Sequence, residues 1–582
     1  MSCRVSLFLR IALGFLLLAG AAAAQVPNTL LVIADDLGVD SVGCYGLGAN
    51  PPPTPVLDGL AAAGIRFTAA QAEPLCSPTR ASLHTGRHAF RAGIGAALPM
   101  SSPGLAASEV LLPEILAPAG IRTGLFGKWH LGNDLGPLTP TAEGFGTFTG
   151  ALGGTLQNYF LWQKVENGVA AQSTAYATTD TVDEALGFVT GSTQPWFVVL
   201  AFHAGHAPYH APPAALHTQN LAGLDPAVTP APFHRAMVEA MDRELGRFLA
   251  SLPAATRTNT NVVFVGDNGT APQVVEAPFD PARSKGTVYQ GGVRVPLIVS
   301  GPAVGGLPRV EPGLVHVVDL FATLAALQGV NARSAVPASV ALDARDLTPL
   351  LAAAGQPSPR SHAYSAEFSG AAPMAAAGDS EVLRSARYAL LRFVRPNLSV
   401  REELYDLVAD PFQLVNLLAQ PLSATAAEAH RELSRELARL RELAWSTTYG
   451  TGCNGAGITP DLAASPGLRP AIGTTFGWTV QGLGTAAPFA ALGIGFQGAA
   501  WNGQPLPADL AAFGMPGCRL WTDLASVQLL AAAGGSASWT VAVPNQAALL
   551  GTQVLAQGFP LAAGANAAGV LATGAVEAVL GR

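Results

Sequence analysis

The chain has 582 residues, of which 49% are hydrophobic and 12% are charged, and its formal net charge at pH 7 is −7. Because a single hydrophobic core seldom serves a chain of this length, we expect at least two domains. The weakly acidic charge balance provides no basic surface for a phosphate backbone, so nucleic acid is excluded as an expected partner.

The N-terminal 24 residues have the pattern of an export signal. Arg4 and Arg10 give a positive start, Ile11–Leu18 is apolar, and Ala22–Ala24 offers a small-residue cleavage site. The apolar run is shorter than the roughly 20 residues that a membrane-spanning helix needs, and later alanine-rich stretches are interrupted by Gly and Pro. We therefore predict an exported protein, in the periplasm, at the cell surface or secreted, with no membrane span in the mature chain.

Strand-like and helix-like segments alternate from about residue 27 to residue 330. Apolar runs predict buried strands, and apolar residues at helical spacing predict helices. The predicted strands are Asn28–Ala34, Trp196–Phe202, Asn261–Val265 and Val295–Ser300. The predicted helices are Thr54–Ala63, Thr174–Val189, Phe233–Leu252 and Leu314–Leu327. This alternation is typical of an α/β fold with a mostly parallel mixed sheet covered by helices.

Two further regions follow the alternating part. Residues 360–445 combine a candidate strand at Tyr388–Val394 with a periodic, charged helix at Ala424–Leu443, which indicates a smaller α+β subdomain. Residues 446–582 are rich in Gly, Ala and Pro and contain short apolar runs between turn residues, as in a β-sandwich-like accessory module. Cys453 and Cys518 both lie in this β-rich region and form the candidate disulfide of an exported chain.

Oxygen-bearing side chains follow two of the predicted strands. Asp35 and Asp36 come directly after Asn28–Ala34, and Asp267 and Asn268 come shortly after the strand that ends at Val265. Ligand sites in such sheets lie beyond the carboxyl ends of the strands. Adjacent carboxylates need a cation or hydrogen-bond donors, and oxygen ligands suit calcium or magnesium. Each pair alone also fits an ordinary polar strand end, but two pairs together favour a shared metal site.

The segment Cys76–Arg80 predicts the start of a short helix, because Pro78 suits a first helical turn and Gly86 suits the C-terminal end. Cys76 would then lie at the helix N-terminus, where backbone N–H groups favour an anion. Arg80 is four positions further along and therefore projects on the same face. Two interpretations of Cys76 are open, a nucleophile with a low pKa or a buried structural cysteine.

Four basic side chains are further candidates. Lys128 and His130 follow an apolar segment and would point to the same side of an extended chain. His206 follows the strand Trp196–Phe202, and Lys285 precedes a glycine-rich stretch. Each of them alone is more simply read as a satisfied or solvated side chain.

In chain order, these segments together resemble the sulfatase family of the alkaline-phosphatase superfamily, of the arylsulfatase A and B type. The matching motifs are Ala34–Gly38, Cys76–Arg87, Gly127–Gly132, His206–Pro208, Gly266–Gly269, Lys285–Thr287 and Glu403–Leu407. The resemblance covers about residues 28 to 445. It implies an alkaline-phosphatase-like fold. The predicted division is a signal peptide at 1–24, a catalytic domain at 25–359, a C-terminal subdomain at 360–445 and the accessory module at 446–582.

The resemblance also implies the chemistry of the site. A formylglycine-generating maturation enzyme would oxidise Cys76, and the hydrated aldehyde would attack the sulfate ester. Calcium, in preference to magnesium, would be bound by Asp35, Asp36, modified Cys76, Asp267 and Asn268. Arg80 and Lys128 would hold the hydrate, and His130 would be the base that triggers sulfate release. His206 and Lys285 would contact the sulfate ester.

The predicted activity is hydrolysis of sulfate monoesters, either aryl sulfates or carbohydrate sulfates. The substrate would be a sulfated small molecule or polysaccharide. A phosphonate or phosphate ester hydrolase of the same superfamily is the alternative enzyme. A catalytically inactive carbohydrate-binding protein is the alternative from another class, and the complete set of candidate residues argues against it.

Overall fold

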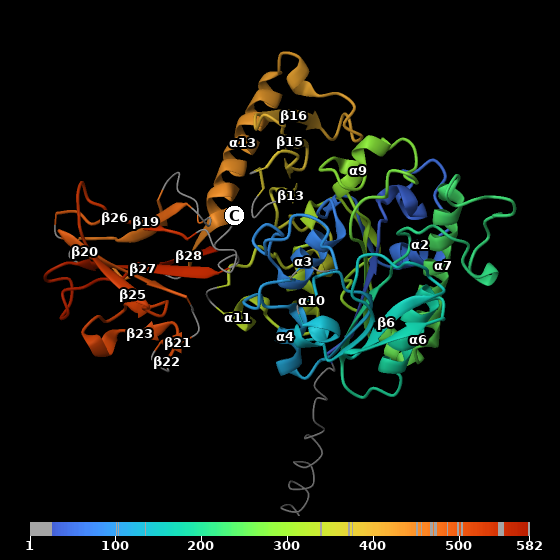
Figure 1. The fold of residues 1–582 in the computed structure, drawn as a ribbon, viewed down its shortest axis with the longest axis horizontal. Coiled ribbons are helices and arrows are strands. Elements are labelled where there is room, and N and C mark those ends of the chain that lie inside the picture. The colour runs from blue at the N-terminus through green and yellow to red at the C-terminus, as the bar shows by residue number, and fades with distance from the viewer. Residues whose placement is uncertain are drawn as a thin grey trace, which may run out of the picture.

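The computed structural model describes most of residues 26–579. The gaps are at 101, 103, 134, 338–339, 370–372, 375, 450–451, 456, 466–469, 471–473, 486, 497–499, 502–503 and 545–551. The predicted signal peptide at 1–24 lies outside the described residues. Figure 1 shows a large α/β body joined through a long helix to a smaller body made of strands. Within the described part of the chain, none of the helices has the length and apolar character that a bilayer crossing requires.

The large body is built on a ten-stranded sheet of order β11-β2-β10-β9-β1-β8-β4-β5-β6-β7. Its central strands are β1 (Asn28–Ala34), β4 (Arg122–Lys128), β8 (Trp196–Ala201) and β9 (Thr260–Gly266). These four strands pair in parallel, whereas β10 and the β5–β6–β7 edge pair antiparallel. The others are β2 (Ile65–Phe67), β5 (Thr147–Ala151), β6 (Trp162–Glu166), β7 (Val169–Ser173), β10 (Leu297–Ser300) and β11 (Arg309–Glu311). The predicted mostly parallel mixed sheet is therefore confirmed.

Helices cover both faces of this sheet, which explains why its central strands are apolar throughout. Alternate residues of β1 enter different cores, since Leu30 packs with one cluster and Leu31 with the other. One face is covered by α2 (Pro55–Ala63), α6 (Ala177–Val189) and α7 (Pro230–Ser251). The other is covered by α3 (Cys76–Thr85), α4 (Leu112–Leu116) and α10 (Asp319–Leu327).

The prediction of a helix at Leu314–Leu327 is wrong for the first residues of that range. Residues Val315–His316 form β12, which pairs in parallel with β3 (Ala70–Gln71). The helix α10 begins only at Asp319, whose carboxylate accepts the backbone N–H of His316 at 2.9 Å. Pairing with β3 thus outweighs the local helical pattern.

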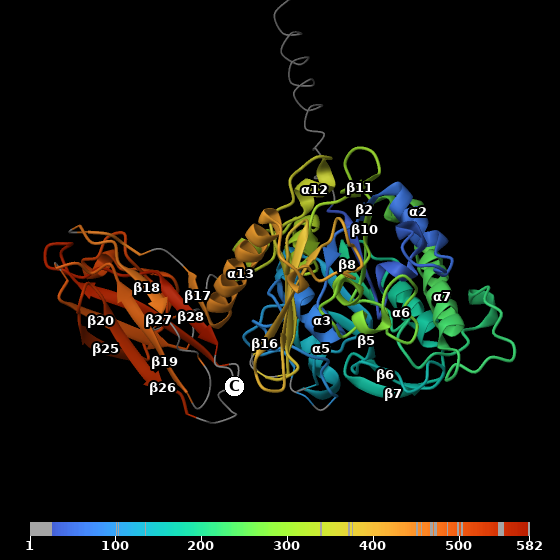
Figure 2. The same ribbon diagram turned by 90° about the horizontal axis from the view of Figure 1, so that it is seen from above.

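The α+β subdomain consists of an antiparallel sheet of order β13-β14-β15-β16, and the helix α13 (Ala424–Trp445) packs on it. The strands are β13 (Ala363–Glu367), β14 (Ser380–Arg384), β15 (Tyr388–Val394) and β16 (Val400–Asp406). Figure 2 shows α13 between the α/β body and the β-rich module.

The β-rich module has a five-stranded sheet and a three-stranded sheet that share one hydrophobic core. The first contains β17 (Ser446–Tyr449), β20 (Phe489–Gly495), β25 (Ser526–Ala531), β27 (Gln553–Leu561) and β28 (Ala575–Val579). The second contains β18 (Asp461–Ala464), β19 (Thr475–Gln481) and β26 (Ala537–Ala542). The overall fold class that the sequence predicts is confirmed, while the domain boundaries remain predictions.

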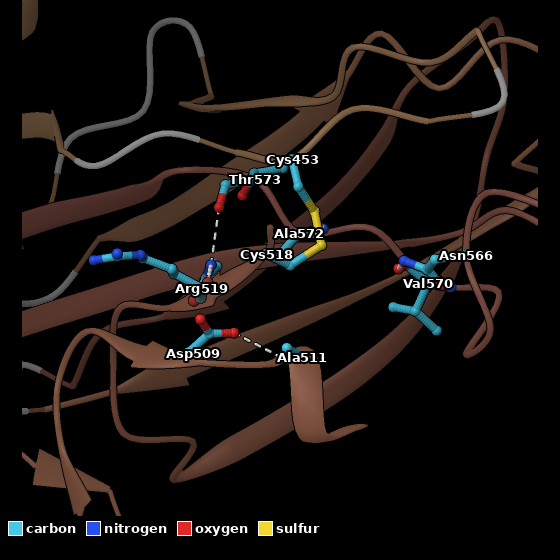
Figure 3. The surroundings of a disulfide bond; sticks show 10 residues. Cys453, Asp509, Ala511, Cys518, Arg519, Asn566, Val570, Ala572 and Thr573 are labelled. Atoms are coloured by element: carbon cyan, nitrogen blue, oxygen red, sulfur yellow. Dashed lines mark hydrogen bonds between the residues drawn. A yellow bond between two sulfur atoms is a disulfide. The ribbon is translucent and has the colours of Figure 1, made fainter. Parts of the chain in front are cut away.

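A disulfide between Cys453 and Cys518 closes a loop of 65 residues inside this module (Figure 3). The Sγ atom of Cys453 also accepts the backbone N–H of Ala572 at 3.2 Å. The disulfide therefore links the start of the module to the residue before β24 (Arg519–Leu520), and the hydrogen bond links it to the segment just before β28. Among the described residues, Cys44 and Cys76 are free.

Candidate active site

The carboxyl ends of β9, β1, β8 and β4 meet at one edge of the central sheet, because these strands are adjacent and parallel. The side chains at or just after these strand ends are Asp267 and Asn268, Asp35 and Asp36, His203 and His206, and Lys128 and His130. The helix α3 contributes its first residue, Cys76, and its second turn, Arg80. The parallel register thus gathers segments that are far apart in the sequence.

Cys76 is buried beside two carboxylates. Its Sγ atom and one carboxylate oxygen each of Asp35 and Asp267 all lie within 4.8 Å of one another. The backbone N–H of Asp36 donates to Asp267 Oδ1 at 3.1 Å, and Asn268 Nδ2 donates to Asp36 Oδ1 at 3.0 Å. The structure therefore brings together all five residues that the resemblance implies as metal ligands.

Three cationic side chains face these three carboxylates. Lys128 Nζ lies 2.6 Å from Asp35 Oδ2, and Lys285 Nζ lies 2.6 Å from Asp36 Oδ1. Arg80 Nη2 lies 2.9 Å from Asp267 Oδ2, and its Nη1 donates to the carbonyl oxygen of Lys128 at 2.9 Å. Since the carboxylates are buried, water screens these attractions little. The cations are thereby held at fixed positions around Cys76.

Burial and neighbouring charges act in opposite directions on the carboxyl groups. Burial favours the protonated form of Asp35, but Lys128, His206 and Arg80 outweigh it and hold the pKa of Asp35 well below its usual range. Burial, with the negative charge of Asp35, raises the pKa of Asp267. Two carboxylates this close resist simultaneous ionisation unless more positive charge is present.

The thiol of Cys76 does not have the low pKa that its place at a helix N-terminus suggests. Burial raises the pKa of Cys76 to about 12, with Asp35 and Asp267 adding to the rise and Lys128 opposing it. The unmodified side chain therefore stays protonated near neutral pH. The interpretation of Cys76 as a thiolate nucleophile is wrong for this structure.

The two candidate histidines flank this centre. His130 has a φ of 59°, so the chain is no longer extended there, and its Nε2 lies 3.1 Å from the carbonyl oxygen of Leu98. The prediction that Lys128 and His130 share one side of an extended chain thus fails after Lys128, where β4 ends. Burial, with the charges of Lys128 and Arg80, lowers the pKa of His130 well below its usual value. The Nε2 of His206 lies 3.7 Å from Asp36 Oδ2.

Tyr159, which the sequence motifs do not include, holds the segment that carries His206. The Tyr159 hydroxyl lies 2.7 Å from the carbonyl oxygen of His203 and 2.8 Å from that of His206. An isolated tyrosine in an irregular segment carries no motif that would have indicated this contact.

The residues present fit a divalent cation. Asp35 Oδ1 and Asn268 Oδ1 are buried and have no hydrogen-bond donor. Unpaired buried oxygens are rare in proteins and call for a partner. The candidate ligands from Asp36 and Asp267 are also oxygen atoms. Such a set of oxygen ligands suits a hard ion such as calcium or magnesium.

A second buried cluster of Glu73, His88 and His316 also has potential metal-binding atoms within 4.8 Å of one another. However, His316 Nδ1 accepts the backbone N–H of Val318 at 3.2 Å, which places the proton of the neutral ring on Nε2. A metal-bound histidine needs the opposite arrangement, with its second nitrogen donating a proton. This cluster is therefore a neutral polar part of the core.

The Glu73 carboxyl provides a test of this interpretation. Burial raises the pKa of Glu73 from 4.5 to about 8. The folded protein thus keeps a proton there that the unfolded chain loses, so this group lowers stability as the pH rises from about 4.5 to about 8. Glu73→Gln is a neutral isostere and is expected to raise the free energy of unfolding by about 4 kcal/mol at pH 8, and by far less at pH 4.5.

Thermal denaturation at both pH values measures this effect. The exposed Glu166 on β6 offers a control, because Glu166→Gln should leave both midpoints unchanged. Equal shifts for Glu73→Gln at the two pH values would contradict the proton assignment.

Comparisons with known proteins agree with the site. A family model described as Sulfatase matches residues 27–330. The chain is 30% identical over 520 residues to arylsulfatase A of Homo sapiens, an alignment that covers 78% of this chain and 96% of that protein. It is 31% identical over 376 residues to N-acetylgalactosamine-6-sulfatase of Canis lupus familiaris, covering 57% of this chain and 67% of that protein.

Solved structures show the same architecture. The structure of Ps i-CgsB in complex with k-i-k-neocarrahexaose has a TM-score of 0.60 and 25% identity, covering 72% of this chain and 93% of its own. A phosphonate monoester hydrolase of Agrobacterium radiobacter has a TM-score of 0.54 and 21% identity, covering 72% of this chain and 96% of its own, and this likeness concerns the fold alone.

Proposed function

The chain belongs to the sulfatase family of sulfuric ester hydrolases, and we propose that it cleaves aryl or carbohydrate sulfate monoesters with a formylglycine made from Cys76 and a bound calcium ion. The observation that carries this proposal is the place of Cys76. Its side chain is buried against Asp35 and Asp267, and the ion pairs of those carboxylates hold Lys128 and Arg80 beside it.

The proposed calcium ligands are Asp35, Asp36, Asp267, Asn268 and the modified residue 76. When bound, the cation would polarise the sulfate oxygens and favour ionisation of an attacking hydroxyl. Two observations support these ligands. The Oδ1 atoms of Asp35 and Asn268 are buried and unpaired, and burial, together with the negative charge of Asp35, raises the pKa of Asp267.

Formylglycine, as its hydrate, would supply one hydroxyl to attack sulfur and a second to release sulfate. The protonated state of the unmodified thiol supports the need for such a change, because Cys76 itself is a poor nucleophile. The N-terminus of α3 favours negative charge at residue 76.

The surrounding side chains would stabilise charge, transfer protons and contact the sulfate. Arg80 and Lys128, fixed by their ion pairs, would orient residue 76 and stabilise developing charge. The neutral ring of His130, with a buried and unbonded Nδ1, would accept a proton during sulfate release. His206 would donate a proton to the leaving oxygen, and Lys285 would contact the sulfate.

The proposal extends to the whole chain. We propose export after removal of residues 1–24, to the periplasm, the cell surface or the medium, and oxidation of Cys76 by a maturation enzyme. Residues 25–359 would form the catalytic domain, residues 360–445 its C-terminal subdomain, and residues 446–582 an accessory module.

Kinetics on matched esters test the proposed function. The matured protein is expected to hydrolyse 4-nitrophenyl sulfate with a higher kcat/KM than bis(4-nitrophenyl) phosphate, because the site is proposed to be complementary to sulfate transfer. The two substrates share the 4-nitrophenolate leaving group, so the ratio does not depend on the basicity of the leaving group. A higher kcat/KM for the phosphate diester would favour the alternative, a phosphonate or phosphate ester hydrolase.

A further inference from the structure

A cleft of about 550 Å³ lies at the end of β5, apart from the residues assigned above. This volume is within the range of about 300–1,000 Å³ that is usual for small-molecule sites. Side chains and backbone from the end of β5, from β6 and from β7 form its wall. The lining residues used below are Met100, Leu152, Gln157, Leu161, Gln163 and Gln172.

The cleft adjoins the candidate active site through the segment that follows β5. The backbone N–H of His130 donates to the carbonyl oxygen of Leu152 at 3.0 Å. A Cβ atom on Gly154 would lie 2.3 Å from Cε1 of His130, so the imidazole packs directly against this backbone. At its other end, the segment is attached near His206 through the Tyr159 hydroxyl. The wall of the cleft is therefore connected to both candidate histidines.

The lining combines uncharged polar groups with apolar ones. None of the described residues that line the cleft is charged. Gln157, Gln163 and Gln172 present amides that donate and accept hydrogen bonds. Met100 and Leu161 are 50% and 46% exposed and offer apolar surface beside them. Such a surface suits a sugar or aryl group with hydroxyls and apolar faces.

No lining side chain of this cleft would offset the loss of hydration of a negatively charged leaving group. A carboxylate or a second sulfate would lose water on entering and would meet no cation among the lining side chains. The lysine and arginine side chains of the candidate site are already paired with Asp35, Asp36 and Asp267. Lys164 on β6 is paired with Asp180 and Glu184.

We propose that this cleft receives the leaving alcohol of the ester and selects uncharged alcohols over anionic ones. The inference rests on the proposed function, because it assumes that sulfate is transferred at residue 76. It adds a substrate class, monosulfated aryl or glycosyl compounds whose sulfate is the only anionic group.

Two isosteric esters test the selection, 4-carbamoylphenyl sulfate and 4-carboxyphenyl sulfate. Wild-type protein is expected to have the higher kcat/KM on the carbamoyl ester. Gln163→Lys and Gln172→Lys should each raise the ratio of carboxyl to carbamoyl kcat/KM by about three- to fivefold, since each adds a cation at a partly solvated wall. Gln194→Lys is the matched control, because Gln194 is exposed and outside the cleft, and should leave the ratio unchanged.

The possible outcomes distinguish failure of the selection by the cleft from failure of the proposed function. An unchanged ratio in both cleft variants, with unchanged melting temperatures, would overturn the selection by the cleft. An equal rise in Gln194→Lys would overturn it as well, because the effect would then come from net charge. If the matured wild-type protein hydrolysed neither ester, the proposed function itself would fail and the inference with it.

Discussion

Replacement of Cys76 by alanine is expected to abolish sulfate ester hydrolysis, with a loss in kcat/KM on the order of 10⁴-fold or more. Alanine provides no oxygen that could attack sulfur, and it cannot be oxidised to an aldehyde. The substitution removes only one sulfur atom from the buried start of α3, so the fold should persist. Initial rates on 4-nitrophenyl sulfate, together with the melting temperature, measure both effects.

Cys44 provides the matched control for this experiment. It is the other free cysteine among the described residues, it is half-buried, and its backbone N–H donates to Asp58 of α2 at 2.8 Å. Cys44→Ala should therefore keep the wild-type rate. Substantial activity in Cys76→Ala would rule out covalent catalysis by residue 76.

Removal of the divalent cation is expected to have the second largest effect. Chelation should lower kcat on the order of 10²-fold or more, because the sulfate would lose its main source of positive charge. Added calcium should restore the rate. The melting temperature should fall on chelation and recover with calcium, since ligand binding to the folded state alone adds about 2.7 kcal/mol at 100 times Kd.

Asp267→Asn extends this test to a named ligand. The variant keeps the size of the side chain but removes a charge that also pairs with Arg80, so a higher calcium concentration should be needed for half-maximal activity. Asp183→Asn, on the exposed side of α6, is the control and should match the wild type. Full activity of the wild type after exhaustive chelation would contradict a catalytic cation.

The centre of the fold could be predicted because its signals are local. The strand β1 was expected at Asn28–Ala34 and has those bounds, since an apolar run ends abruptly at two aspartates. The strands β8 and β9 carry similar runs, and their parallel order follows from the helices between them. Once these strands are adjacent, the meeting of Asp35 with Asp267 follows from the geometry of a parallel sheet.

Other features depend on contacts that a local pattern does not contain. The helix N-terminus at Cys76 suggested a low pKa, but burial and the carboxylates of Asp35 and Asp267, distant in sequence, reverse the direction. The hairpin of β6 and β7 was not predicted, because its strands are short and largely exposed. The cleft beside β5 could not be predicted either, since its wall requires that hairpin.

The central claim is that residue 76 is an aldehyde in the mature protein. Mass spectrometry of the peptide that contains residue 76, from protein produced in its native host, tests this most directly. The account predicts a peptide in which CHO replaces CH2–SH and which forms a hydrazone with an added hydrazine. A peptide that carries only an unmodified thiol, in protein that hydrolyses sulfate esters, would contradict it.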